Sequence, residues 1–351
     1  MRHLLWLPIL LPMLLVAGVV YQWLGALRDR RRFLPWGRLI DIGGGRRLYL
    51  SQKGSDGPTV IFESGIAATS QNWLPVQEAV SGFARAVVYD RGGLGWSSAC
   101  GSERIPSNIA RELRVMLRQA GIEPPYLLVG HSFGGLVVRR YAADYPDEVA
   151  GVVLVDAMRS EEWPPVNEER RAHLDRGIRL SAIGATLARF GVARLVATSM
   201  LCRSGRISGA ASRAGGAGGL HVLDRITCEV GKMPRKVWPV VAAHWSSPYF
   251  YRGLVAHLQA VPASVREMHH AAPIDDTPVL LLTPGRSEPL SMEALRRIGL
   301  HTRQVIAAKS GHWIHLDEPD LVIDAIRSMV EDSRLPIPAD AVPTLRRDAC
   351  L

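Results

Sequence analysis

One segment near the middle of the chain constrains the fold more than any other. Residues 126–129 form a short apolar run, the next six residues read Gly-His-Ser-Phe-Gly-Gly, and a stretch with helical periodicity then continues to Tyr145. This pattern predicts a buried strand, a tight turn and a helix in direct succession. Such a turn strains the residue at its tip, and glycines two positions to either side leave the space that it needs. The context is typical of a turn that presents Ser132 as a nucleophile; the alternative is a serine in a Gly-rich turn without that role.

Apolar runs that suit buried strands recur along the rest of the chain. They occupy residues 59–63, 86–89, 126–129, 152–155, 279–282 and 304–307. Before them, residues 38–42 and 46–52 are two short alternating segments, and the three glycines between these segments predict a hairpin. Helices are expected over residues 105–120 and 133–145, and again near the C-terminus after an Asp317 cap. Because runs that are apolar throughout suit strands buried on both faces, the chain is predicted to be an α/β protein with a mostly parallel, doubly wound sheet.

The alternation of short apolar runs and helical stretches is absent between residues 157 and 276. This interval is too long for an ordinary connection. We therefore predict an inserted, largely helical cap there, with the core of the fold divided into residues 33–156 and 277–332. Residues 204–220 within the cap are rich in Gly, Ala and Ser and are expected to be a flexible loop or a lid. Residues 333–351 lack periodicity and are read as a C-terminal tail.

Residues 1–32 are predicted to be a membrane anchor with an Arg-rich flank. Residues 4–27 contain no Asp, Glu, Lys or Arg, and as a helix they would extend about 36 Å, enough to cross a bilayer core of about 30 Å. The alternative is a cleaved signal peptide. The arginines that follow the apolar run favour an uncleaved single-pass helix with the body of the chain on the cytoplasmic side.

Charge and cysteine spacing exclude several other functions. The net charge is +9, but the first 47 residues already hold eight arginines against two acidic residues. This local excess argues against nucleic-acid binding by the body of the chain. The sequence has no C-x-x-C pair and no phosphate-binding P-loop, so we expect neither a metal nor a cofactor.

A nucleophilic serine needs a base and a carboxylate that orients the base, in the chain order Ser, Asp or Glu, His. His312 follows the last predicted strand and is the expected base. Glu288, just beyond the strand over residues 279–282, is the leading candidate for the acid, and Asp156 at the end of the preceding strand is the alternative. His315 is expected to be a structural or rim histidine, and His131 a buried, hydrogen-bonded one.

Acyl transfer also needs backbone donors for a developing oxyanion. One is expected to be the N–H of Phe133, directly after the nucleophile. The other is assigned to the N–H of Ile66, in the loop after the strand that ends at Glu63.

Four segments carry a resemblance to a known family: ESGIAATSQNW (63–73), YDRGGLGWSS (89–98), PPYLLVGHSFGGLVVRRYAADYPDEVAGVVLVDAM (124–158) and SGHWIHLDEPDLVIDAIR (310–327). The chain resembles the α/β-hydrolase superfamily over about residues 38–332, and in particular its bacterial membrane-anchored serine hydrolases of the esterase and lipase type. The resemblance implies that Asp90, Arg91 and the glycines at 92, 93 and 95 form a structural loop near the pocket. A serine at position 132 argues against the epoxide hydrolase and haloalkane dehalogenase relatives, which use aspartate there.

The expected function is therefore hydrolysis of an ester, with a lipid or another apolar acyl compound as candidate substrate. Thioester, peptide or C–C bond hydrolysis uses similar residues. A membrane-tethered binding protein without turnover is the alternative from another class. The sequence leaves the oligomeric state open.

Overall fold

One sheet organises the part of the chain that the structure describes. The computed structural model describes residues 7–54, 57–160, 168–202, 230–274 and 276–332. Eight strands lie in the order β1-β2-β4-β3-β5-β6-β7-β8. They are β1 (Arg38–Asp41), β2 (Arg47–Lys53), β3 (Thr59–Glu63), β4 (Arg85–Tyr89), β5 (Tyr126–His131), β6 (Val149–Val155), β7 (Val279–Pro284) and β8 (Thr302–Ala307). From β4 to β8 every neighbouring pair is parallel, whereas β2 is antiparallel to both β1 and β4. The mostly parallel sheet is the one that the sequence predicts.

The predicted hairpin is formed by β1 and β2. Its turn carries Gly43, Gly44 and Gly45, all three with positive φ, a region that glycine enters without strain. The hairpin adds an antiparallel edge to the sheet, far from the strand ends that carry the candidate site.

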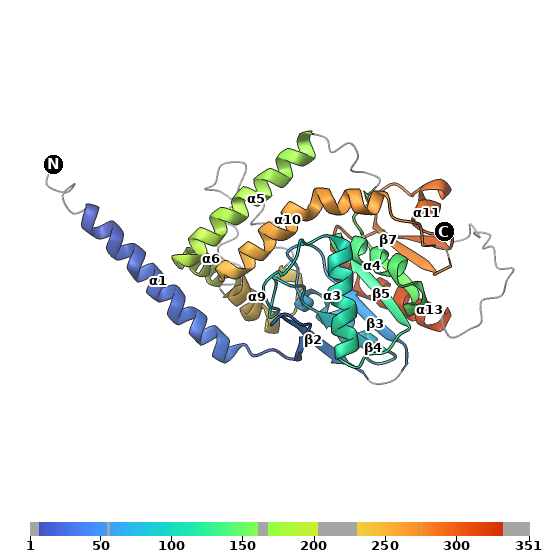
Figure 1. Cartoon of the computed structure of the whole chain (residues 1–351), viewed down its shortest axis with the longest axis horizontal. Helices are drawn as coiled ribbons and strands as arrows, with labels where there is room; N and C mark the ends of the chain where they lie inside the picture. The colour runs from blue at the N-terminus through green and yellow to red at the C-terminus, as the bar shows by residue number, and fades with distance from the viewer. Residues whose placement is uncertain (1–6, 55–56, 161–167, 203–229, 275, 333–351) are drawn as a thin grey trace.

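Helices cover both faces of the sheet and bury one apolar layer on each side (Figure 1). One layer lies under α3 (Pro106–Gln119), α4 (Phe133–Asp144) and α11 (Met292–Ile298). The other lies under α2 (Leu74–Val80) and α13 (Pro319–Asp332). Short turns of 3-10 helix, η2 (Ser70–Trp73) and η3 (Pro146–Glu148), join these elements. A sheet with apolar packing on both faces explains why its central strands are apolar throughout.

The C-terminal helix begins differently from the expectation. Asp317 is the last residue of a separate short helix, α12 (Ile314–Asp317), and does not cap α13. Its carboxylate accepts the N–H of Gly311 at 2.9 Å. The Asp317 side chain therefore ties α12 back to the loop that carries His312.

Between β6 and β7 the described chain is helical. It forms α5 (Glu168–Arg189), α6 (Val192–Cys202), the 3-10 turn η5 (Arg235–Val237), α9 (Trp238–Trp245) and α10 (Pro248–His269). In Figure 1 these helices gather on one side of the molecule, and α10 packs along α5. The predicted loop over residues 204–220 lies outside the described residues, and the predicted cap boundaries stay predictions.

The N-terminal helix α1 (Leu7–Arg32) projects from the body of the molecule (Figure 1). Its segment Leu10–Arg32 is long and apolar enough to cross a membrane. A signal sequence would satisfy the same criterion of length and composition.

Candidate active site

Ser132 stands at the sharp turn between β5 and α4. Its backbone has φ 53° and ψ −120°, a strained conformation for a residue with a side chain. A Cβ at Gly134 would lie 2.6 Å from the Glu63 carbonyl oxygen, and one at Gly130 would lie 2.7 Å from the Gly134 carbonyl oxygen. Both glycines of the motif are therefore required by close backbone approach, as the sequence predicts.

The turn is hydrogen-bonded to the end of the neighbouring strand β6. The Ser132 N–H donates to the Val155 carbonyl at 3.1 Å, and the Ser132 carbonyl accepts the Met158 N–H at 2.9 Å. Asp156 lies between these two partners. Its backbone also has a positive φ, 38°, and its N–H donates to the Leu282 carbonyl of β7 at 2.8 Å. The backbone around Asp156 is thus hydrogen-bonded both to the turn after β5 and to β7.

Asp156 is bonded to His312. The His312 Nδ1 lies 2.6 Å from Asp156 Oδ2, and both side chains are partly exposed. A carboxylate can only accept from neutral imidazole, so Nδ1 carries the proton and Nε2 is left as the basic nitrogen. This arrangement is the one that orients a general base in a serine nucleophile site.

The structure does not bring the leading candidate for the acid, Glu288, to His312. The Glu288 side chain is exposed, and within the described residues it forms no hydrogen bond or ion pair. The alternative, Asp156, occupies the position that was expected for it. The physical reason is the strand order: β6 lies directly beside β5, whereas the loop with Glu288 follows β7, one strand farther from Ser132.

His131 links the histidine loop to the nucleophile turn. Its Nε2 donates to the His312 carbonyl at 2.9 Å, and the two rings lie 4.7 Å apart. Burial, followed by the neighbouring histidines, holds the pKa of His131 well below its usual range. The side chain is buried and hydrogen-bonded, as the sequence predicts. For Ser132 Oγ itself, the described structure gives no hydrogen bond to His312; such bonds are often long without substrate and tighten when it binds.

The loop after β3 packs directly on Ser132. A Cβ at Gly65 would lie 3.3 Å from the Ser132 Cβ, so only glycine permits this approach without displacement. Ile66 follows in this loop, and Phe133 is the first residue of α4, where helix N–H groups lack intrahelical acceptors. The assignment of these two N–H groups as oxyanion donors stays a prediction.

Comparisons with known proteins agree with this architecture. A family model described as the alpha/beta hydrolase fold matches residues 58–193. The Bacillus subtilis protein YqjL, itself uncharacterized, is 33% identical over 105 residues, which cover 30% of this chain and 42% of that protein. An AB hydrolase superfamily protein of Gibberella zeae is 34% identical over 127 residues, covering 34% of this chain and 39% of that protein. The chain thus matches about two fifths of the length of these relatives.

Solved structures extend the likeness over most of the chain. Cfl2 from Burkholderia cenocepacia aligns with a TM-score of 0.64 and 20% identity, covering 83% of this chain and 94% of that one. A thermophilic esterase from Thermogutta terrifontis aligns with a TM-score of 0.52 and 19% identity, covering 85% and 98%. The chain therefore has the α/β-hydrolase fold, and its residues 58–193 match the family model for that fold.

Behind the Gly65 loop the protein buries an ion pair that residue types alone do not predict. Arg91 Nε lies 3.6 Å from the Glu63 carboxylate, its Nη2 donates to the Gly65 carbonyl, and its guanidinium lies over the Phe133 ring at 5.3 Å. Tyr89 donates its hydroxyl to Glu63. Burial raises the pKa of Glu63 and lowers that of Arg91. The signal for this network is the single carboxylate at the end of an otherwise apolar strand.

Asp90 organises the adjacent loop. Its carboxylate accepts the N–H of Ser70 at 2.8 Å and of Trp96 at 3.0 Å. Burial raises the pKa of Asp90 to about 6, although these hydrogen bonds act in the opposite direction. A Cβ at Gly95 would collide with the Asp90 carboxylate. The structural role that the resemblance implies for this loop therefore has a concrete basis.

His315 is a third histidine of the site, and it is buried rather than at a rim. Its ring stacks on Trp73 with centroids 4.2 Å apart and lies 4.6 Å from the His131 ring. Burial, assisted by the charge of His312, lowers the pKa of His315 to about 3. His131 and His315 therefore form a neutral layer beneath the partly exposed His312.

Proposed function

We propose that this chain is a serine hydrolase that cleaves esters through an acyl-enzyme. One observation carries the proposal. The strained turn at Ser132 is hydrogen-bonded to the residues on either side of Asp156, and the Asp156 Oδ2 lies 2.6 Å from the His312 Nδ1. The nucleophile turn after β5 and the carboxylate after β6 thus follow adjacent strands, and the loop after β8 carries the base to the carboxylate.

In this mechanism the Ser132 hydroxyl attacks the ester carbonyl while His312 Nε2 accepts its proton. The N–H groups of Ile66 and Phe133 would bind the oxyanion of the tetrahedral intermediate. Collapse breaks the bond to the alcohol, which takes the proton from His312. Water then attacks the acyl-enzyme with His312 again as base, and the carboxylic acid leaves.

Asp156 orients the imidazole and stabilises its protonated form without taking the proton. Arg91 acts one layer farther back, because it holds the Gly65 carbonyl and so the loop that carries Ile66. A serine nucleophile distinguishes this chemistry from that of relatives that attack with an aspartate.

We further propose that α1 is inserted in a membrane as a single-pass anchor, with the body of the protein on the cytoplasmic side because Arg28, Arg30, Arg31 and Arg32 follow the apolar stretch. Membrane attachment favours a lipid or another apolar acyl compound as the substrate.

The proposal is tested with detergent-purified protein and its Ser132→Ala variant, assayed on p-nitrophenyl esters of increasing acyl length. We expect turnover by the wild type and none above background by the variant. A fluorophosphonate probe should label Ser132 in the wild type alone. Folded wild-type protein that neither labels nor hydrolyses any ester would favour the binding-protein alternative.

A further inference from the structure

The N-terminal helix is packed against the corner where α5 ends and α6 begins. Gly18 of α1 lies so close to the Phe190 carbonyl that a Cβ would collide with it. On the other side of the contact, the Tyr21 ring lies 2.7 Å from the position of a Cβ at Gly191, whose φ is 75°. Small residues on both partners let backbones approach closely, as at interfaces between helices in membranes. We call residues 180–199 the α5–α6 corner.

Polar side chains at this contact are joined by hydrogen bonds. Arg194 of α6 is buried; its Nε donates to Gln22 at 3.0 Å and its Nη1 to Asp29 at 2.6 Å. Gln22 in turn donates to the Ser246 carbonyl at 2.9 Å. Polar groups in an apolar environment need partners of this kind, so the network is compatible with surroundings that contain no water.

The position of the contact limits where a bilayer can lie. The α5–α6 corner touches α1 from Gly18 to Asp29, along the C-terminal part of the apolar stretch and the start of the charged flank. From residue 4 to residue 17, before this contact, a helix would extend only about 21 Å, which is less than a bilayer core of about 30 Å. A bilayer that α1 crosses must therefore include the apolar part of this contact, from Gly18 to Gln22.

The outer surface of the α5–α6 corner suits that environment. Six of its large apolar side chains are exposed to between 39% and 54%: Leu180, Ile183, Leu187, Val192, Leu195 and Val196. Within residues 180–199 the exposed charge is that of Arg189, whose long side chain can reach towards headgroups. The N-terminal half of α5, in contrast, exposes Glu168, Glu169, Arg171 and Asp175. Together the two helices, bent by 99°, are apolar enough for a broken membrane span.

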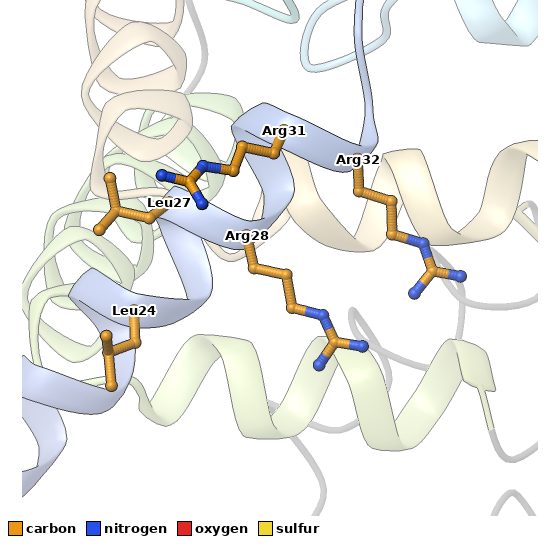
Figure 2. Close-up of a pocket in the computed structure, with 5 residues that line it drawn as sticks. All are labelled: Leu24, Leu27, Arg28, Arg31 and Arg32. Atoms are coloured by element: carbon orange, nitrogen blue, oxygen red, sulfur yellow. The ribbon is translucent and has the colours of Figure 1, made fainter.

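Arginines mark the level at which the apolar surface ends. At the C-terminal end of α1, an open hollow on the surface of the helix is lined by Leu24, Leu27, Arg28, Arg31 and Arg32. Figure 2 shows Arg28 and Arg32 extending in the same direction from the helix, and Arg31 beside Leu27. Guanidinium groups next to apolar side chains are the pattern expected where acyl chains give way to phosphate groups.

We propose that the α5–α6 corner lies in the lipid bilayer together with α1, as a second membrane contact of the protein. The occupant of its apolar surface is lipid acyl chains, because that surface is continuous with the exposed apolar side chains of α1. This inference rests on the membrane insertion of α1 that is part of the proposed function, and it does not depend on ester hydrolysis.

The test measures membrane depth at single cysteines labelled with an environment-sensitive fluorophore. The full-length chain, with its native cysteines replaced by alanine and its fold checked by circular dichroism, is reconstituted into vesicles of phosphatidylcholine and phosphatidylglycerol with or without spin-labelled acyl chains. The test sites are Ile183→Cys and Leu195→Cys, each 54% exposed. Met292→Cys on α11, 59% exposed, is the matched control, and Leu14→Cys reports on α1.

We expect the spin labels to quench most of the emission at Ile183→Cys and Leu195→Cys, as at Leu14→Cys, and to leave Met292→Cys unchanged. Quenching at Leu14→Cys alone would overturn the inference and leave α1 as the single contact. Blue-shifted emission at the corner without quenching would mean that protein, such as a second copy, covers it, and would overturn the inference as well. No quenching even at Leu14→Cys would remove both the anchor and the corner from the membrane.

Discussion

The sheet and the α5–α6 corner use the same kinds of side chain in opposite ways. In the sheet, Val60, Leu128 and Val153 are fully buried between two layers of helices. On the corner, Ile183 and Leu195 point outward and remain more than half exposed. Because exposed apolar surface of this extent is unfavourable in water, the two regions indicate two different surroundings. The apolar side chains of the sheet are shielded from water by the packing of the protein itself. Those of the α5–α6 corner need apolar surroundings outside the protein, such as lipid acyl chains.

The largest effect is expected at the candidate active site, where Asp156 and Glu288 differ in their position relative to His312. Asp156→Asn should lower kcat by about 10³- to 10⁴-fold, because an amide favours the wrong imidazole tautomer. Glu288→Gln, the same exchange of carboxylate for amide on an exposed loop, should leave kcat unchanged. Steady-state kinetics on the best p-nitrophenyl ester measures both. A loss of activity in Glu288→Gln with an active Asp156→Asn would reverse the assignment of the acid.

The next effect compares the two regions directly. Leu128→Ala, in the centre of the sheet, should lower the free energy of unfolding by about 2–5 kcal/mol, because it leaves a cavity. Leu195→Ala on the corner should change it by less than about 0.5 kcal/mol in detergent. Denaturant unfolding of both variants measures the difference. Equal losses would show that the corner is packed like a core.

A smaller effect is expected on the free energy of unfolding at acidic pH, because His315 is buried beneath the candidate site. The pKa of His315 is about 3 in the folded protein and about 6.5 when unfolded, so between these values the unfolded chain binds one more proton. Stability should therefore fall as the pH drops from about 6.5 towards about 3, by roughly 2 kcal/mol at about pH 5. His315→Gln should be less stable near neutral pH, where stacking on Trp73 is lost, but should lose less on acidification.

Urea unfolding at about pH 7.5 and about pH 5 measures this difference. His173→Gln, which removes an exposed histidine of α5, is the control and should follow the wild type. Identical pH dependence in His315→Gln and the wild type would mean that His315 is not held neutral.

The smallest effect is expected at the contact between α1 and the α5–α6 corner. Gly18→Leu forces α1 away from Phe190, whereas Ala17→Leu places the same side chain at an exposed position one residue away. Hydrogen exchange in detergent should become faster in α6 for Gly18→Leu alone, with β5 unchanged in both variants. Equal exchange of α6 in the two variants would contradict close packing at Gly18.

The sequence predicts the sheet well because its signals are local. Apolar runs reproduce β3 at both ends, and the glycines around Ser132 reveal a turn whose crowding requires them. The choice between Glu288 and Asp156 is not local, because it depends on which strand end faces the imidazole across the sheet. Nor does residue type alone reveal that His315 stacks beneath the site or that Arg91 holds the Gly65 loop.

The corner is harder still to predict. Its apolar residues have the spacing of an ordinary surface helix. What joins it to α1 is a set of tertiary contacts that includes Gly18, Tyr21, Gln22 and Asp29. Those contacts span 172 residues of sequence between Gln22 and Arg194. No periodicity within either helix encodes them.

The packing of α1 against the α5–α6 corner also determines which substrate concentration would control the rate of hydrolysis. An enzyme held to the bilayer at two places meets an apolar ester in two dimensions. Its rate then follows the mole fraction of that ester among the lipids. Adding inert lipid lowers this mole fraction and slows the reaction, even when the bulk concentration of the ester stays the same. A tether made by a flexible linker alone would leave the protein free to sample the aqueous volume as well.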